Sequence, residues 1–402
     1  MSDKNTKRTI VTLPGDGIGK TVLESALQVL EAAGFIADYV EGDIGWEFWR
    51  AEGNPLPRRT LDLIAEHKIA LFGAITSKPK DEAFEELAPE LKSLGLIYAS
   101  PIVGLRQHFG LDICLRPCHS YHGNPLNFVR RGRDGIFEEP SVDVAIFRQN
   151  TEGLYGGVEW SNPPDDVHDA LMTHPKFSQN FGDTPIDELS ISTRIFTKKA
   201  TERILRAAFE HAKKYEYKSV TVCEKPNVIR ETSGMMYKMA QEIQAADFPG
   251  IELWNTNIDA QMMWLTKNPE NYDVIVAGNM FGDIVSDGFA GLIGGLGFAA
   301  SAQYNTDTGI GVFEPTHGSA PRYAGYATSI VNPIAMIEAA CMMLDFIDEQ
   351  AIAIKIRKAV AEIIDEGVIR TYDMARLTGT ADVIHRGAAS TVGMAEAIIA
   401  RL

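Results

Sequence analysis

The sequence contains no long apolar segment and no cluster of basic residues. Its apolar runs fall short of the roughly 20 residues that a membrane-spanning helix needs, and the first residues, MSDKNTKRT, lack the apolar centre of a signal peptide. Lysine and arginine number 38 against 54 aspartate and glutamate, which gives a net charge of −16. Nucleic acid and anionic membranes are poor partners for such a chain. We therefore expect a cytoplasmic protein without a nucleic-acid or membrane partner.

Cysteine is also scarce, with four residues in 402. They form neither a CxxC pair nor the regular spacing of a disulfide framework, and Cys114 and Cys118 are spaced CxxxC. Cys223 and Cys341 stand alone. This pattern predicts buried thiols in a reducing compartment rather than disulfides or a metal–thiolate site.

A further absence concerns the dinucleotide fingerprint. The expected strand over residues 9–13 is followed by GDGIG, residues 15–19, whose glycines are spaced GxGxG and not GxGxxG. The Rossmann pattern needs the longer spacing to place a pyrophosphate at the start of the following helix. We therefore interpret this loop as a tight turn that leads into a helix ending near residue 33.

Strand and helix patterns alternate along most of the chain, which favours an α/β fold with a mainly parallel sheet covered by helices. The length suggests two or more domains. Two segments lack periodicity: residues 117–140, a long connection of the kind that is often functional, and residues 162–187, an excursion that we place at a subunit interface. Strands are expected over residues 9–13, 38–41, 69–72, 111–115, 142–148, 190–193, 220–223, 251–254 and 272–277; helices over 47–50, 60–66, 81–94, 101–109, 197–215, 232–244, 260–265, 334–348 and 350–366.

The most informative stretch is GNMFGDIVSDGFAGLIGGLG, residues 278–297, which follows a buried strand. Asp283 and Asp287 are four residues apart, so a helix carries both carboxylates on one face. Such a pair suits a hard cation, Mg²⁺ or Mn²⁺, bound together with an anionic substrate. The alternative is two solvated acids, since this spacing is common. The scarcity of lysine and glutamate around them favours a site.

Several other residue types point to anion chemistry. Arg106, Arg116 and Arg148 stand at or near the ends of apolar runs, where a guanidinium needs an anion, either a substrate carboxylate or a structural partner. Tyr155 lies among glycines in NTEGLYGG and could contact a ligand or simply pack. Lys225 follows a buried strand, where it could transfer protons or remain a surface residue of a turn.

A second loop rich in glycine and proline, EPTHGSAPRYAG, covers residues 314–325. Within it His317 could contact an aromatic ring, and Arg322 with Tyr323 could hold a phosphate. Tyr372 and Arg376 in TYDMAR are four residues apart and share a face if the segment is helical.

Four segments in this order, LRQHFGLDICLRP, FRQNTEGLYGGVEW, GNMFGDIVSDG and FEPTHGSAPRYAG, are together very specific. Through them the chain resembles the isocitrate/isopropylmalate dehydrogenase family over essentially its whole length. The resemblance implies a non-Rossmann α/β fold, with a large cofactor-binding domain over residues 1–111 and 294–402. A smaller domain over residues 112–293 would carry a dimer clasp at about 153–196. It also implies a homodimer with shared active sites that acts on a small hydroxy di- or tricarboxylate.

The resemblance assigns roles to individual residues. It implies that Tyr155, Lys225 and Asp283 are catalytic, with Tyr155 protonating the enol and Lys225 of the partner transferring a proton. Four residues would bind the substrate: Ser100, Arg106, Arg116 and Arg148. Three acids would bind Mg²⁺ or Mn²⁺: Asp283, Asp287 and, from the partner subunit, Asp259. The cofactor would be held by Thr76, Glu314, His317, Gly318, Ala320, Arg322, Tyr323, Asn332, Tyr372 and Arg376.

Cofactor and substrate can be argued within this resemblance. NAD-using members usually carry an aspartate where this chain has Arg322, and an arginine pairs with a 2′-phosphate instead, so we predict NADP. Ser100 suits the γ-carboxylate of isocitrate, whereas Ile102 would suit an alkyl group. We expect oxidative decarboxylation of isocitrate to 2-oxoglutarate, with 3-isopropylmalate or homoisocitrate as alternative substrates. A silent regulatory subunit and a pure anion-binding protein are further alternatives, and the acidic segment 78–96 could change access.

Overall fold

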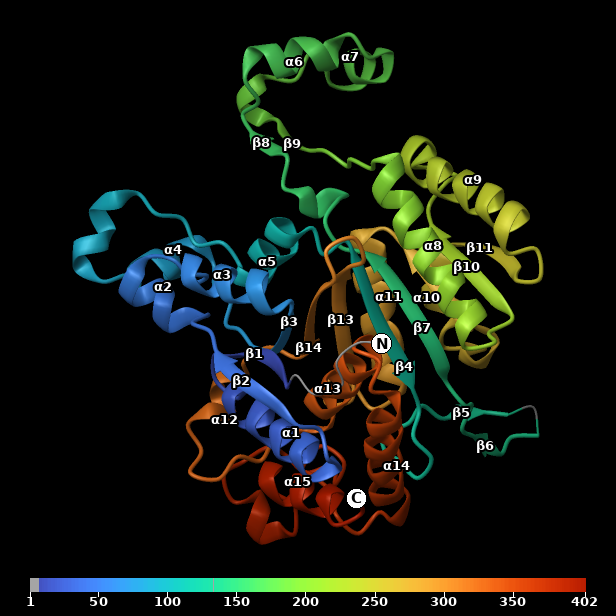
Figure 1. The fold of residues 1–402 in the computed structure, drawn as a ribbon. Coiled ribbons are helices and arrows are strands. Elements are labelled where there is room, and N and C mark those ends of the chain that lie inside the picture. The colour runs from blue at the N-terminus through green and yellow to red at the C-terminus, as the bar shows by residue number, and fades with distance from the viewer. Residues whose placement is uncertain (1–6, 133) are drawn as a thin grey trace.

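One mixed sheet of ten strands runs through the molecule (Figure 1). The computed structural model describes residues 7–132 and 134–402. The strand order is β11-β10-β12-β7-β4-β13-β14-β3-β1-β2. In chain order the strands are β1 Arg8–Gly15, β2 Ala37–Glu41, β3 Ile69–Ala74, β4 Ile113–His119, β7 Asp143–Gln149, β10 Ser219–Glu224, β11 Glu252–Asn257, β12 Val274–Ala277, β13 Ala300–Asn305 and β14 Ile310–Pro315.

The sheet is mainly parallel, as the alternation of strands and helices predicts. The exceptions lie at its centre, where β4 is antiparallel to β7 and to β13, and β13 is antiparallel to β14. The sequence prediction missed the β13–β14 hairpin. Its first strand, ASAQYN, contains no β-branched residue and only one aromatic residue, Tyr304, so its residue types give little indication of a strand.

Helices cover both faces of the sheet. On one face lie α1 Gly19–Ala33, α13 Ile334–Phe346, α14 Gln350–Glu366 and α15 Thr391–Ile399. Helix α13 is apolar nearly all round and its residues Ile334 to Leu344 are largely buried, as expected of a helix inside a core. Each such leucine or isoleucine contributes about 1.5–3 kcal/mol through burial. A second apolar core lies between β7, β10 and β12 and the helices α8 Lys198–Lys214 and α9 Arg230–Asp247.

The segment 78–96 differs from its prediction as one helix over 81–94. Helix α4, Lys80–Glu85, ends early, and a 3₁₀ helix follows over Pro89–Leu94. Pro89 has no N–H to continue the α-helix, which explains the break. The segment packs Ala83 and Leu87 against Trp46 and Trp49 of α2, Trp46–Glu52.

The excursion over residues 162–187 projects from the body of the molecule as an arm (Figure 1). Its base is the antiparallel pair β8 Glu159–Ser161 and β9 Ser190–Ser192. Its tip holds two short helices, α6 Asp165–Met172 and α7 Pro175–Phe181, which the sequence prediction did not include. The arm coincides with the clasp predicted at about 153–196.

The predicted boundary between the two domains falls between two neighbouring strands of the same sheet. Strand β4 belongs to the segment 112–293 and its partner β13 to the segment 294–402. One continuous sheet therefore joins both parts, and the division remains a prediction. All four cysteines are buried with free thiols, in agreement with the sequence. Within the described ranges, no helix combines the length and the apolar character needed to cross a bilayer.

Candidate active site

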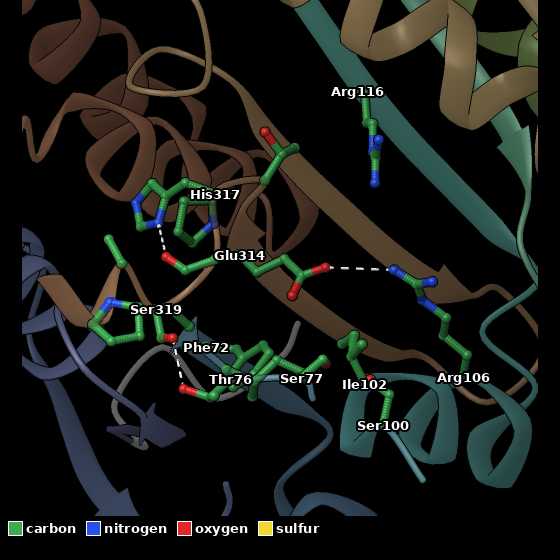
Figure 2. A pocket seen from close by; sticks show the side chains of 17 residues that line it. Phe72, Thr76, Ser77, Ser100, Ile102, Arg106, Arg116, Glu314, His317 and Ser319 are labelled. Carbon is green, nitrogen blue, oxygen red and sulfur yellow. Dashed lines mark hydrogen bonds and ion pairs between the residues drawn. The ribbon is translucent and has the colours of Figure 1, made fainter. Parts of the chain in front are cut away.

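A cleft of about 490 Å³ opens where β3, β4, β14 and the helix α5, Pro101–Phe109, come together (Figure 2). The loop after β3 and the loop after β14 form one side, and the start of α5 forms the other. Eight of the predicted site residues line it: Thr76, Ser100, Arg106, Arg116, Glu314, His317, Gly318 and Ala320. Ile102 lines it as well, beside Ser100, whose hydroxyl makes no capping bond to α5.

The three arginines converge beside this cleft. Arg116 on β4 and Arg148 on β7 lie on neighbouring strands. Arg106 on α5 lines the cleft together with Arg116, and Figure 2 shows both side chains. Their exposed fractions are only 8%, 2% and 8%. Burial first, and the positive charge of Arg116 second, lower the pKa of Arg148 to about 10. So much buried positive charge in one place is suited to binding carboxylates.

The two predicted metal-binding acids face these arginines. Helix α11, Asn279–Leu292, carries both carboxylates on one side, as the four-residue spacing predicts. The Nη1 atom of Arg116 lies 3.1 Å from Oδ1 of Asp283 and 3.3 Å from Oδ1 of Asp287. Arg148 also pairs with Asp283. Guanidinium groups of the same chain therefore balance the negative charges of Asp283 and Asp287, for which the sequence prediction invoked a metal ion.

Gly282 allows this close arrangement. A Cβ atom added to Gly282 would lie 2.8 Å from Cβ of Arg148, closer than real side chains approach. The residue before helix α11, Gly278, donates its N–H to Glu224 over 2.8 Å, which ties the start of the helix to the end of β10. Helix α11 can thus pack against β7, with its carboxylates next to the guanidinium groups of Arg116 and Arg148.

The donor set fits a hard divalent cation. Asp283 and Asp287 offer carboxylate oxygens on one helix face, with the small Ser286 between them. Burial raises the pKa of Asp287, the positive charge of Arg116 opposes this shift, and the neighbouring carboxylate of Asp283 adds to it. Among the residues that the structure describes, no three His, Cys, Asp or Glu side chains gather as a metal site.

Tyr155 lies at the same acids. Its hydroxyl donates a hydrogen bond to Oδ2 of Asp283 over 3.2 Å, and the guanidinium of Arg148 lies 5.4 Å from its ring centre. Burial, followed by the charge of Asp283, raises the pKa of Tyr155. The phenol therefore keeps its proton at neutral pH and can donate it.

Lys225 and Asp259 lie elsewhere and pair with each other. Lys225 directly follows Glu224, whose fully buried carboxylate accepts hydrogen bonds from Arg194 over 2.8 Å and Ser233 over 2.6 Å. Neither Lys225 nor Asp259 lines the cleft of their own chain. Among the described residues, no hydrogen bond or ion pair joins Lys225 or Asp259 to Asp283.

The loop after β14 carries several of the residues predicted to bind the coenzyme. The Nδ1–H group of His317 donates to the carbonyl of Gly318 over 3.0 Å, and its Nε2 is buried without a partner among the described residues. An orphaned buried nitrogen facing a cleft fits a bound group that completes its hydrogen bonding. Thr76 and Ser319 join the two loops through a 2.6 Å contact between their hydroxyl oxygens.

The GDGIG loop supports this side from behind. The carboxylate of Asp16 accepts hydrogen bonds from the backbone N–H of Trp46 and of Thr76, each over 2.7 Å. Gly15 and Gly17 have positive φ, and a Cβ on Gly15 would lie 1.9 Å from the carbonyl oxygen of Ala74. The interpretation of this loop as a tight turn is confirmed.

The predicted phosphate-binding group is only partly assembled. Arg322 lies 5.8 Å from the ring centre of Tyr323, and the rings of Tyr323 and Tyr372 are 5.5 Å apart. Residues 372–376 form a turn, so the helical face considered for Tyr372 and Arg376 is wrong. Arg376 has a φ of 53° and donates to the carbonyl of Pro125. Asn332 is held by Asp373 over 3.2 Å.

The sequence prediction missed one buried residue of the site, Gln303 on β13, which has no exposed surface. Its side chain contacts Arg106, Asn150 and Glu314. A signal was present, because Ser301, Gln303 and Asn305 alternate with Ala302 and Tyr304, the period of a strand with one polar face. It could be recognised only once residues 300–305 were known to be a strand.

Known proteins resemble the chain along its whole length. The family model described as isocitrate/isopropylmalate dehydrogenase matches residues 9–397. Protein DlpA of Legionella pneumophila is 40% identical over 97% of this chain, which spans only 58% of DlpA. A 3-isopropylmalate dehydrogenase of Archaeoglobus fulgidus is 37% identical, with 90% of this chain and 92% of the relative covered. The crystal structure of isocitrate dehydrogenase from Methylococcus capsulatus superposes with a TM-score of 0.79 at 34% identity, covering 98% and 99% of the two chains.

Proposed function

The chain belongs to the isocitrate/isopropylmalate dehydrogenase family of β-decarboxylating dehydrogenases, and from this premise we propose that it oxidises and decarboxylates isocitrate with NADP and Mg²⁺ or Mn²⁺. The observation that carries the proposal is the convergence of Arg106, Arg116 and Arg148 on one buried site beside two acids. A substrate with several carboxylates next to a hydroxyl group suits this combination.

The proposal assigns one chemical role to a divalent cation and one to a nicotinamide coenzyme. A divalent cation held by Asp283 and Asp287 would act as a Lewis acid toward the substrate hydroxyl and a neighbouring carboxylate. A nicotinamide coenzyme held by the loop with His317 and Gly318 would accept the hydride. The arginines bind and orient the substrate carboxylates, and Arg116 and Arg148 already pair with the carboxylate of Asp283.

Proton transfers fall to Lys225 and Tyr155. Tyr155 is at the acids, keeps its proton and can deliver it to carbon after CO₂ has left. Lys225 is paired with a carboxylate, so it is placed to pass a proton between its ammonium group and an acid. Since Lys225 does not line the cleft of its own chain, we assign it to the site of the partner subunit.

We include a homodimer with shared sites in the proposal. Helix α10, Ile258–Trp264, carries Asp259 and exposes Met263 and Trp264 by 49% and 42%, and Ile284 on the neighbouring helix α11 is 43% exposed. Apolar side chains of this size on adjacent helices fit a subunit contact. A two-fold dimer formed there would carry Lys225 and Asp259 toward the partner's Asp283.

NADP is supported by the chemistry of Arg322. It stands beside Tyr323 and Tyr372, whose hydroxyl groups are further donors for a phosphate. A guanidinium cannot accept hydrogen bonds from ribose hydroxyls, but it forms charge-assisted bonds with a 2′-phosphate. Because the guanidinium of Arg376 donates to the carbonyl of Pro125, we assign the main part of the phosphate contact to Arg322.

A second substrate class rests on one specific observation, namely that Ile102 lines the cleft next to Ser100. An apolar side chain at that point would suit the alkyl group of 3-isopropylmalate better than a carboxylate. Homoisocitrate, with a longer acidic arm, is intermediate between the two classes.

The deciding experiment measures kcat/KM for NADP reduction with Mg²⁺ and isocitrate, homoisocitrate or 3-isopropylmalate. We expect isocitrate to lead, and an Ile102→Asn variant to widen that lead because an amide can donate to the γ-carboxylate. A lead for 3-isopropylmalate would overturn the choice of isocitrate. Metal-dependent binding without any reduction of NADP or NAD would indicate a silent subunit or a binding protein.

A further inference from the structure

A buried carboxamide connects the substrate side of the cleft to the coenzyme side. The Oε1 atom of Gln303 accepts hydrogen bonds from Nε of Arg106 over 2.5 Å and from Nδ2 of Asn150 over 2.8 Å. Its Nε2 atom donates to Oε1 of Glu314. Gln303 has no exposed surface, so these contacts are made away from water.

The strand register explains why the carboxamide sits at this point. Gln303 on β13 lies opposite Cys114 on β4 and opposite Val312 on β14. It therefore stands between the strand that carries Arg116 and the strand that carries Glu314. A polar group buried in an apolar sheet costs free energy unless it is hydrogen-bonded. The side chains of Arg106, Asn150 and Glu314 all form their hydrogen bonds with the one amide group of Gln303.

The hydrogen bond from Nε of Arg106 to Gln303 fixes the orientation of the Arg106 guanidinium. Since Gln303 occupies Nε, the two terminal nitrogens of the guanidinium remain for the cleft, one of them 3.7 Å from Oε1 of Glu314 (Figure 2). An arginine side chain has many rotamers, and holding it through Nε leaves the planar end in a single orientation. Such preorganisation lowers the cost of binding a carboxylate.

We infer that Gln303 is a positioning residue, which holds Arg106 for a substrate carboxylate and couples it to Glu314 on the coenzyme side. The inference rests on the proposed function, because it assumes that Arg106 binds the substrate. Gln303 does not line the cleft and acts only through its neighbours.

The amide, with one donor and one acceptor, suits this position better than a carboxylate. Glu314 faces the positive charges of Arg106, Arg116 and Arg148, while its burial opposes ionisation and raises its pKa. A glutamate at position 303 would still accept from Arg106 and Asn150 but would oppose Glu314 with a second carboxylate. One shared proton would restore the missing donor.

The first test replaces Gln303 by leucine and compares the steady-state constants with those of the wild-type dimer. We expect KM for the hydroxy acid to rise about 10- to 100-fold, the value of one lost hydrogen bond to a charged group, with a smaller change in KM for the coenzyme. Thr221→Val is the matched control, since Thr221 on β10 is a buried polar residue without a hydrogen-bond partner in the described chain. Its constants should equal those of the wild type.

The second test uses Gln303→Glu and a pH series from about 8 to about 6, the range in which paired buried carboxylates take up a proton. We expect kcat/KM of this variant, relative to wild type, to rise as the pH falls. A purely structural role would give no such recovery. An unchanged KM in Gln303→Leu would overturn the inference, and so would a pH profile of kcat/KM in Gln303→Glu that runs parallel to that of the wild type. If Gln303→Leu does not fold, the Gln303→Glu variant alone decides.

Failure of the inference can be told apart from failure of the proposed function. If the wild type reduces no coenzyme with any of the three substrates, the proposed function is wrong. The positioning role is then judged from calorimetric binding of isocitrate with Mg²⁺ to wild type and Gln303→Leu. Equal dissociation constants would contradict it, and a weaker variant would support it.

Discussion

Arg116 and Asp283 form an ion pair, with 3.1 Å between Nη1 and Oδ1. One of them is proposed to hold a substrate carboxylate and the other a divalent cation. The two groups neutralise each other in this chain. A metal ion that binds Asp283 would have to displace Arg116 from it, and a substrate carboxylate that binds Arg116 would have to displace Asp283. Metal and substrate binding are therefore expected to depend on each other.

Arg116→Met should change the two affinities in opposite directions. Removing the guanidinium leaves Asp283 and Asp287 without their cationic neighbour, so Mn²⁺ alone should bind about tenfold tighter, whereas isocitrate should bind more weakly. Calorimetric titration of each ligand measures both. The exposed Arg58, which pairs with Asp62 on the surface, supplies the control variant Arg58→Met. Weaker Mn²⁺ binding in Arg116→Met would contradict the exchange of partners.

Lys225→Met and Tyr155→Phe should each abolish most turnover and should complement each other when co-expressed. In a dimer with shared sites, a mixed pair contains one site with both intact residues and one with neither. Random assortment predicts recovery of about a quarter of the wild-type rate. The kcat of the co-expressed protein is compared with that of each variant alone. No recovery in a purified mixed dimer would place Lys225 in the same site as Tyr155 of its own chain.

Arg322→Asp should move coenzyme preference from NADP toward NAD. Loss of a charge-assisted bond to the 2′-phosphate is worth about 1.5–3 kcal/mol, which is about ten- to a hundredfold in the ratio of kcat/KM values. Arg376→Ala should have a smaller effect, because that guanidinium donates to Pro125. The two ratios are measured side by side. An unchanged ratio for Arg322→Asp would remove the phosphate contact from the proposal.

His211 should make the fold sensitive to mild acid. Its ring packs against Phe147 and Tyr217, and burial followed by the charge of Lys214 lowers the pKa of His211 to about 4 from 6.5. Between these two pH values the unfolded chain binds a proton that the folded chain does not. The free energy of unfolding therefore falls as the pH drops through this window, by up to about 3 kcal/mol.

Denaturant unfolding at one protein concentration, at pH 7 and pH 5, measures this loss. His211→Phe keeps an aromatic ring in the same place and removes the titrating group, so its unfolding free energy should fall less between the two pH values. Loss of equal size in both proteins would show that other groups cause the acid sensitivity.

Much of the fold could be read from the sequence because its signals are local. Helix α1, helix α5 and the strand–helix unit around Asp283 follow from apolar period and turn residues within a few positions. The β13–β14 hairpin could not be read in this way. Its strand of alanine, serine and glutamine gains stability from pairing with β4, a strand almost 200 residues away, and not from its own residue types.

The candidate site shows the same division. The four-residue spacing of Asp283 and Asp287 determined that both lie on one helix face, and the position of Arg116 at the end of an apolar run determined that it is buried. Which charges meet could not be derived, since pairing depends on strand order. Only the tertiary structure set Arg116 against Asp283, turned Arg376 toward Pro125 and placed Gln303 between Arg106 and Glu314. Sequence periodicity specifies the face on which a side chain lies, whereas the packing of distant segments decides its partner.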